Sequence, residues 1–262
     1  MIRQDRFLRN LQRGGSLLFS FTNALEVTGP QGDTAAAVRA FLQRVGPYWV
    51  PCEINPFKVA KGESLGFGSR SPISKTFIEA YLRERANELS PSDEGLLNPS
   101  AGFLDLSRIM DWLEKDRVEL EGRKEQIYNA LLQRIAQLRA NYEQRPDALD
   151  EEMPSLPFDS LQPATFVLNH LLRGLVRRAK EFTLKRNDAI DFCHAVVAAA
   201  YGSVATLDKQ WKRRVEELPK PNGLAKIYYP PEIDQFLDEL DGLVSAREGS
   251  REGAPHVYED LR

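Results

Sequence analysis

Four acidic residues stand where an expected strand ends or an expected helix begins. Asp188 and Asp191 are three residues apart at the start of a small-residue helix, so their side chains share one face. Glu26 follows an apolar run of strand length, and Asp208 ends another. In an open α/β sheet such positions meet beyond the carboxyl ends of the strands. Converging carboxylates suit Mg²⁺ or Mn²⁺, so the spacing predicts a divalent cation that activates water and orients a phosphodiester.

Each of these acids also has a structural explanation, which the sequence leaves open. Asp188 is placed to cap its helix, and Asn187 competes for that role. Asp191 in the first turn gains from the helix dipole. Asp208 is placed to cap a helix that begins near the next residue, and Glu26 fits a solvated position in a short helix.

Histidine and cysteine offer little further chemistry. His194 falls on the same helix face as Asp191, where it could orient a ligand or contact phosphate, or be a satisfied, partly buried side chain. Zinc is not expected, because the other histidines have no convincing partners and Cys52 and Cys193 lack metal-ligand spacing. Both cysteines sit among apolar residues, which indicates buried free thiols in a reducing compartment.

Basic residues concentrate around the expected acidic pocket. Residues 171–214 contain ten lysines and arginines but four acids, in a chain whose net charge is −3. This excess favours a track for a phosphate backbone, although solvated helix faces would give the same pattern. The expected nucleic-acid-binding side chains are Arg177, Arg178, Lys185, Arg186, Lys209, Lys212 and Arg213.

The 262 residues suffice for one large domain or for a domain with an insertion. No apolar run is long enough to span a bilayer and the N-terminus lacks a secretory pattern, so we expect a cytoplasmic protein with no membrane partner. The alternation of strands and helices at both ends predicts an α/β core over 1–58 and 164–248. Residues 59–163 are expected to form a helical insertion, and 249–262 a disordered tail.

The expected elements follow from hydrophobic periodicity and from glycine and proline positions. Strands are predicted at 17–21, 48–50 (closed by Pro51), 203–207 and 225–229. Helices are predicted at 4–12, in a short segment capped by Thr22 or Asn23, and at 33–45, 74–89, 106–142, 165–184, 188–201, 210–218 and 232–246. Residues 59–71 and 91–102 are predicted loops, and 146–163 a connector.

These motifs resemble a known family. The pattern Asn187-Asp188-x-x-Asp191-x-x-His194, the small-residue helix and the strand ending in Asp208 resemble the C-terminal half of bacterial PIN-like domains. The strand near residues 226–230 and the last helix are similar to the end of that fold. The strand before Glu26 is similar to its second strand and the acid that follows. The resemblance covers roughly residues 5–58 and 165–246.

The resemblance implies a three-layer α/β/α fold around a short parallel sheet, here with a large helical insertion, and Mg²⁺- or Mn²⁺-dependent ribonuclease activity. Glu26, Asp191 and Asp208 would be the catalytic metal-site acids, Asp188 a further metal ligand, and His194 and Asn187 supporting residues. The family normally opens with a strand ending in aspartate, and nothing before residue 15 matches it, since Asp5 lies in a polar helical context.

Two functions therefore stay open. One is a metal-dependent endoribonuclease, of a toxin or defence type, that cleaves RNA phosphodiesters with metal-activated water. The other is a catalytically inactive PIN-like module that binds RNA or a protein partner such as an antitoxin. A homo-oligomer is compatible with either function.

Overall fold

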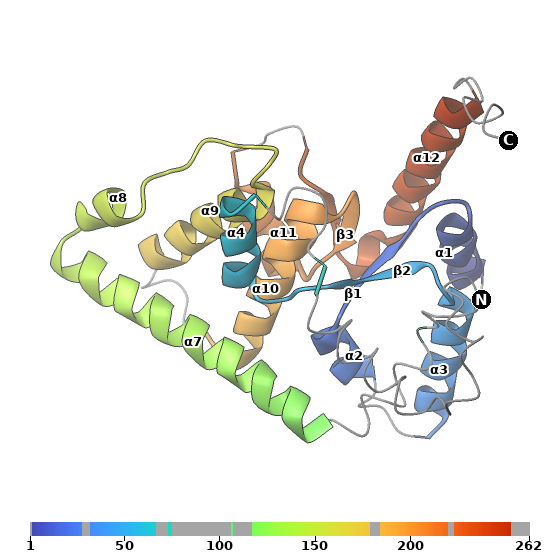
Figure 1. Cartoon of the computed structure of the whole chain (residues 1–262), viewed down its shortest axis with the longest axis horizontal. Coiled ribbons are helices and arrows are strands. Elements are labelled where there is room, and N and C mark those ends of the chain that lie inside the picture. The colour runs from blue at the N-terminus through green and yellow to red at the C-terminus, as the bar shows by residue number, and fades with distance from the viewer. Residues whose placement is uncertain are drawn as a thin grey trace, which may run out of the picture.

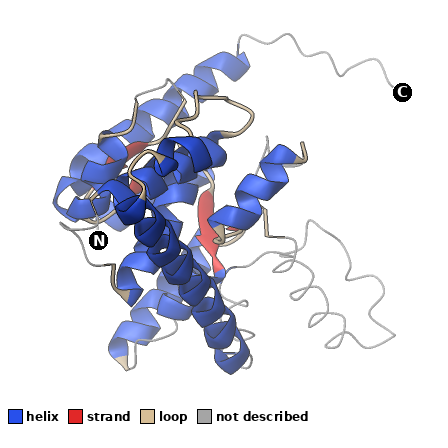
Figure 2. Cartoon of the chain, turned by 90° about the vertical axis from the view of Figure 1, so that its left-hand side faces the viewer, coloured by secondary structure: helices blue, strands red, loops and turns tan. Residues whose placement is uncertain are grey.

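The computed structural model describes residues 2–27, 32–66, 73–74, 106, 117–178, 184–219 and 223–252. Within them the protein is a helix-rich α/β structure (Figures 1 and 2). Residues 75–89 of the predicted helix 74–89, the loop 91–102 and the end of the tail lie outside these residues. The elements in chain order are α1 (Ile2–Gln12), β1 (Leu17–Ser20), α2 (Phe21–Val27), α3 (Asp33–Val45), β2 (Trp49–Cys52), α4 (Pro56–Ser64), α7 (Arg117–Gln144), α8 (Ala148–Glu152), α9 (Pro163–Arg177), α10 (Arg186–Tyr201), β3 (Val204–Thr206), α11 (Lys209–Glu216), β4 (Lys226–Tyr228), the 3₁₀ turn η2 (Pro230–Glu232) and α12 (Ile233–Glu252).

The described strands form two parallel pairs. β1 pairs with β2, with Leu17 opposite Trp49, and β3 pairs with β4, with Val204 opposite Lys226. Parallel strands need a crossover connection, which α2 and α3 supply in the first pair and α11 in the second. The predicted α/β class with parallel strands is confirmed at this level. Among the described residues, however, the pairs are two separate two-stranded sheets.

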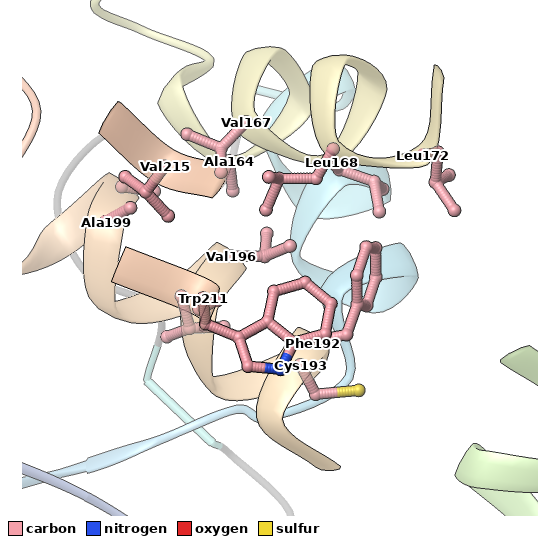
Figure 3. Close-up of a cluster of buried hydrophobic side chains, with 14 of the residues drawn as sticks. Ala164, Val167, Leu168, Leu172, Phe192, Cys193, Val196, Ala199, Trp211 and Val215 are labelled. Atoms are coloured by element: carbon pink, nitrogen blue, oxygen red, sulfur yellow. The ribbon is translucent and has the colours of Figure 1, made fainter. Parts of the chain in front are cut away.

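The larger hydrophobic core lies between α9, α10 and α11 (Figure 3). Trp211 of α11 is 1% exposed and meets the fully buried Phe192 of α10 edge-on, with ring centroids 5.7 Å apart. The alanines and valines of α10 let neighbouring helices approach closely, since they carry little bulk. The helix α7, which crosses the front of the molecule in Figure 2, adds Tyr128, Leu131 and Ile135 to this core. Part of the expected insertion therefore packs into the same core as the C-terminal half.

A second, smaller core joins the N-terminal elements. Leu8 and Leu11 of α1 pack with Phe19 of β1, Leu42 of α3 and Trp49 of β2. Phe19 and Trp49 meet edge-on, with centroids 6.2 Å apart. This core fixes the strand β1, and its carboxyl end leads directly into α2.

The loop predicted over 59–71 is wrong for its first part, because residues 56–64 form α4. The helix is capped by Asn55, whose Oδ1 accepts from Phe57 N and Lys58 N. A tertiary contact holds the last turn of this helix. Glu63 is 3% exposed, and its carboxylate accepts from Ala164 N at 2.8 Å and Thr165 N at 2.7 Å. Glu63 thereby caps the start of α9. The glycine- and serine-rich sequence around Glu63 gives no sign of this contact.

Several boundaries also differ from the prediction. The short helix α2 begins at Phe21, so Thr22 and Asn23 lie inside it and do not cap it. The strand β2 continues through Pro51, which pairs with Phe19. Proline is tolerated in an edge strand because the ladder needs no amide from it there.

The C-terminal helices shift as well. The helix α9 ends at Arg177, seven residues before the predicted end, and α10 begins at Arg186, two residues before its predicted start. The connector 146–163 contains the short helix α8. The final helix α12 runs to Glu252, so it includes residues that were assigned to the tail.

Candidate functional site

The centre of the candidate site is Asp191, a partly buried residue early in α10. Burial and then the neighbouring charges of Asp208, Asp188 and Glu26 raise the pKa of its carboxyl group to about 6. No hydrogen bond or ion pair to this carboxyl group occurs among the described residues. The acids singled out in the sequence therefore act electrostatically on one carboxylate, although they come from α2, from α10 and from the residue before α11.

Asp188 and Asp208 each hold a helix start, and the charge of each acts on Asp191. Asp188 Oδ2 accepts from Lys185 N at 2.7 Å, so Asp188 lies in the first turn of α10 and the prediction that it occupies the N-cap position is wrong. Asp208 does cap α11, as predicted, with Oδ1 accepting from Trp211 N at 2.7 Å. One oxygen of each carboxylate takes this bond, and the other has no hydrogen bond within the described residues. The structural and the proposed chemical roles are compatible.

Glu26 enters the site from α2, close to α7. Partial desolvation raises its pKa although the residue as a whole is exposed, and the ammonium group of Lys124 in α7 lowers it. Asp191, by contrast, has only acids among the charges that shift its pKa appreciably. At the Glu26 edge of the cluster a lysine thus offsets the negative charge, whereas only acids are among the charges that shift the pKa of Asp191.

All four groups are carboxylates, which are donors that hard divalent cations prefer. The spacing is looser than that of a closed cage. Among the described residues, no three histidine, cysteine, aspartate or glutamate side chains are close enough to share a metal ion. An ion here would take one or two carboxylates directly and water for the remaining positions, the usual pattern for Mg²⁺.

A buried polar network adjoins the acids, and the sequence interpretation missed most of it. His194 Nε2 lies 2.9 Å from Thr22 Oγ1 and 3.4 Å from Asn23 Nδ2. Ser20 Oγ lies 2.7 Å from Thr22 Oγ1. Desolvation lowers the pKa of His194 to about 4, so its ring is neutral at physiological pH. The available signal was a set of small polar residues directly after a buried strand, where side chains reach the sheet edge.

Most of the expected nucleic-acid-binding side chains are held by acids. Five of the seven form ion pairs in the described part of the chain, whereas Lys185 and Lys209 form none there. The pairs are Arg177 with Asp150, Arg178 with Glu217, Arg186 with Glu125, Lys212 with Glu232, and Arg213 with Glu217.

The acidic partners, such as Glu125 and Glu232, lie outside residues 171–214, the segment with the excess of basic residues. The local positive field is therefore weaker than the sequence indicates. Asn187 is exposed, and its side chain makes no hydrogen bond within the described residues. Its supporting role, like the backbone track, stays a prediction.

No protein-family model matches the sequence, and the searches of curated proteins and of solved structures find no match either. Within the described residues, no helix combines the length and the apolar character that a bilayer crossing requires. The function must therefore be argued from the geometry of the site.

Proposed function

We propose that the carboxylates around Asp191 bind Mg²⁺ or Mn²⁺ and that the protein is a metal-dependent endoribonuclease with a PIN-like, three-layer α/β/α core. One observation supports this proposal: burial and then the charges of Asp208, Asp188 and Glu26 raise the pKa of Asp191, and no basic residue is among the causes of the shift. Holding like charges together destabilises the fold, and a bound cation would reverse that cost. Arrangements that persist despite such a cost are typical of functional sites.

The chain's own residues would bind and orient the RNA. A bound cation would supply Lewis-acid stabilisation and a water of lowered pKa. Lys185 precedes α10 and Lys209 opens α11, so these two lysines, which form no ion pair within the described ranges, lie beside site acids in the chain. Both are exposed, and each could bind a backbone phosphate next to the carboxylates.

The second candidate is a catalytically inactive PIN-like module that binds RNA or a protein partner such as an antitoxin. Two observations favour it: the ion pairing of most of the basic side chains and the lack of a three-ligand group among the described residues. The two candidates differ in one measurable property, which is cleavage that depends on the metal.

The test is cleavage of a fluorescent single-stranded RNA with Mg²⁺ or Mn²⁺ present, compared with the same reaction in EDTA. We expect Asp191→Asn and Asp208→Asn to reduce the metal-dependent rate at least about 100-fold, since each removes a charge that holds the ion. Asparagine is also a good N-cap, so Asp208→Asn keeps α11 intact.

Asp159→Asn is the matched control, because Asp159 Oδ1 also accepts a backbone bond, from Leu161 N at 2.8 Å, and it is not among the charges acting on Asp191. It should cleave like the wild type. RNA binding without cleavage in the wild type would favour the inactive module. Cleavage that persists in EDTA, or an equal loss in Asp159→Asn, would contradict the metal site.

A further inference from the structure

The first and the last helices that the structure describes, α1 and α12, lie side by side and are joined by charged groups (Figure 1). Arg3 contacts Asp234 at 2.6 Å, and Arg13 contacts Glu248 at 2.5 Å. The contact positions are 3, 6, 10 and 13 in α1 and 234, 238, 241, 245 and 248 in α12. They follow the same order in both helices, so the helices run parallel. Their spacing of three or four residues keeps them on one face of each helix.

The two halves of α12 are held in different ways. In the first half, Phe236 stacks with Phe7 of α1 and meets Tyr228 of β4 edge-on, with ring centroids 6.4 Å and 6.0 Å apart. Among residues 241–249, by contrast, only Val244 is buried. The second half therefore depends mainly on one valine and on polar contacts with α1.

The polar contacts of this second half are open to water. Arg13 and Glu248 are 43% and 44% exposed, and Arg247 Nη1 donates to Gly14 O at 2.8 Å in an exposed hydrogen bond. An exposed ion pair contributes little to stability, and salt screens it further. The screening length falls from about 10 Å at 0.1 M salt to about 3 Å at 1 M. The attachment of the second half should therefore weaken as the ionic strength rises.

One buried group already favours separation of the two helices. Asn10 is 1% exposed, and its Nδ2 donates to Arg6 O at 3.2 Å and to the carboxylate of Asp241. Its Oδ1 is buried and accepts no hydrogen bond within the described residues. A buried carbonyl oxygen without a donor costs free energy, and water would offset that cost once the helices separate.

We propose that residues 241–249 form a strap that releases from α1 as the ionic strength rises, while the first half of α12 stays packed against Phe7 and β4. Release uncovers a polar face of α1 formed by Arg6, Asn10 and Arg13. The freed end unwinds, because a short helix without packing is unstable in water. The strap goes beyond the proposed function and does not depend on it, since none of its residues belongs to the candidate site.

The test is amide hydrogen exchange of the full chain, followed by mass spectrometry at about 0.02 M and about 1 M NaCl. We expect residues 241–249 to exchange at least about tenfold faster at the higher salt concentration, because release exposes their amides. Residues 233–240 and α10 should change by less than about twofold. Equal exchange of the strap at both salt concentrations, or the same acceleration in α10, would overturn the proposal.

A charge reversal tests the ion pair itself. Arg13→Glu places a carboxylate opposite Glu248, so the strap should exchange faster already at the lower salt concentration. Adding Glu248→Arg restores a pair of opposite charges and should return the exchange rate to within about twofold of the wild type. A strap that does not respond to Arg13→Glu, or that is not restored by the second substitution, would also overturn the proposal.

Arg145→Glu is the matched control. Arg145 contacts Glu151 of α8 at 2.9 Å, and the two side chains are 62% and 63% exposed, so this variant also breaks an ion pair that is open to water. The strap should exchange in Arg145→Glu as it does in the wild type. An equal acceleration in Arg145→Glu and Arg13→Glu would mean that the effect is not specific to the α1–α12 contact, and the strap would be rejected.

Discussion

Two regions of this protein gather acidic side chains in opposite ways. Along α12, acids face arginines of α1: Arg3 contacts Asp234 at 2.6 Å, and Arg13 contacts Glu248 at 2.5 Å. Arg6 bridges two further acids of α12, one of them Asp241. Around Asp191, acids face other acids.

The pKa values of an acid in each region are shifted in opposite directions. Hydrogen bonds from Asn10 and Arg6 lower the pKa of Asp241, whereas burial and its acidic neighbours raise that of Asp191. The α1–α12 ion pairs thus contribute to joining the two ends of the chain, while the cluster costs stability. Residue type alone does not distinguish a structural acid from a functional one, but the sign of the surrounding charge does.

The largest expected effect is on stability at about pH 8. Asp191→Asn removes a carboxylate that is costly to ionise in the folded state, and a pKa raised to about 6 from 3.8 predicts stabilisation by at most about 3 kcal/mol. Asp241→Asn should do the opposite and cost about 1 kcal/mol, because it weakens partly exposed bonds to Arg6 and Asn10. Urea denaturation without metal measures both values. A loss of stability in Asp191→Asn would remove the contrast between the regions.

A smaller effect should appear in the pH dependence of that difference. The folded-state pKa of Asp191 is raised, so its penalty is absent below about pH 4 and grows as the pH rises through about 6. The advantage of Asp191→Asn should therefore vanish on acidification. The stabilisation from Asp241 is present above its unfolded pKa near 3.8 and is lost as the pH falls through its lowered folded value.

His194 opposes Asp191 over the same interval. Its folded pKa is about 4, so stability falls as the pH drops below its unfolded value near 6.5 and the ring must be charged. Comparing Asp191→Asn with the wild type cancels this contribution, since both retain His194. Urea denaturation between about pH 4 and 8 gives the curve. A difference that does not change with pH would mean that Asp191 has an ordinary pKa.

The sequence predicts this fold well where local signals agree with the tertiary contacts. The apolar run at β1 and the cap at Asp208 are both found, because a buried strand and an N-cap are encoded within a few residues. The sequence does not predict the helix α4. Its last turn contains Glu63, whose carboxylate accepts a hydrogen bond from Ala164 N at the start of α9. Because this partner lies 101 residues later in the chain, the contact leaves no local signal. The ends of α9 and α10 were misjudged for a related reason, because periodicity does not mark where a helix stops.

The site was predictable only in part. The acids were identified from their positions after strands and at helix starts, and the structure shows their charges acting together on Asp191. The partners of His194 could not be identified, because Thr22 is 172 residues away in the chain. The ion pairs of the basic residues could not be identified for the same physical reason: Arg186 pairs with Glu125 of α7, which local composition cannot show.

The most direct test of the central claim is the shift in thermal unfolding temperature caused by Mn²⁺, compared among the wild type, Asp191→Asn and Asp241→Asn. A ligand that binds only the folded state raises that temperature, by a few degrees at a concentration about 100-fold above the dissociation constant. We predict this rise in the wild type and in Asp241→Asn, and none in Asp191→Asn. No rise in the wild type, or the same rise in all three proteins, would contradict a cation site at Asp191.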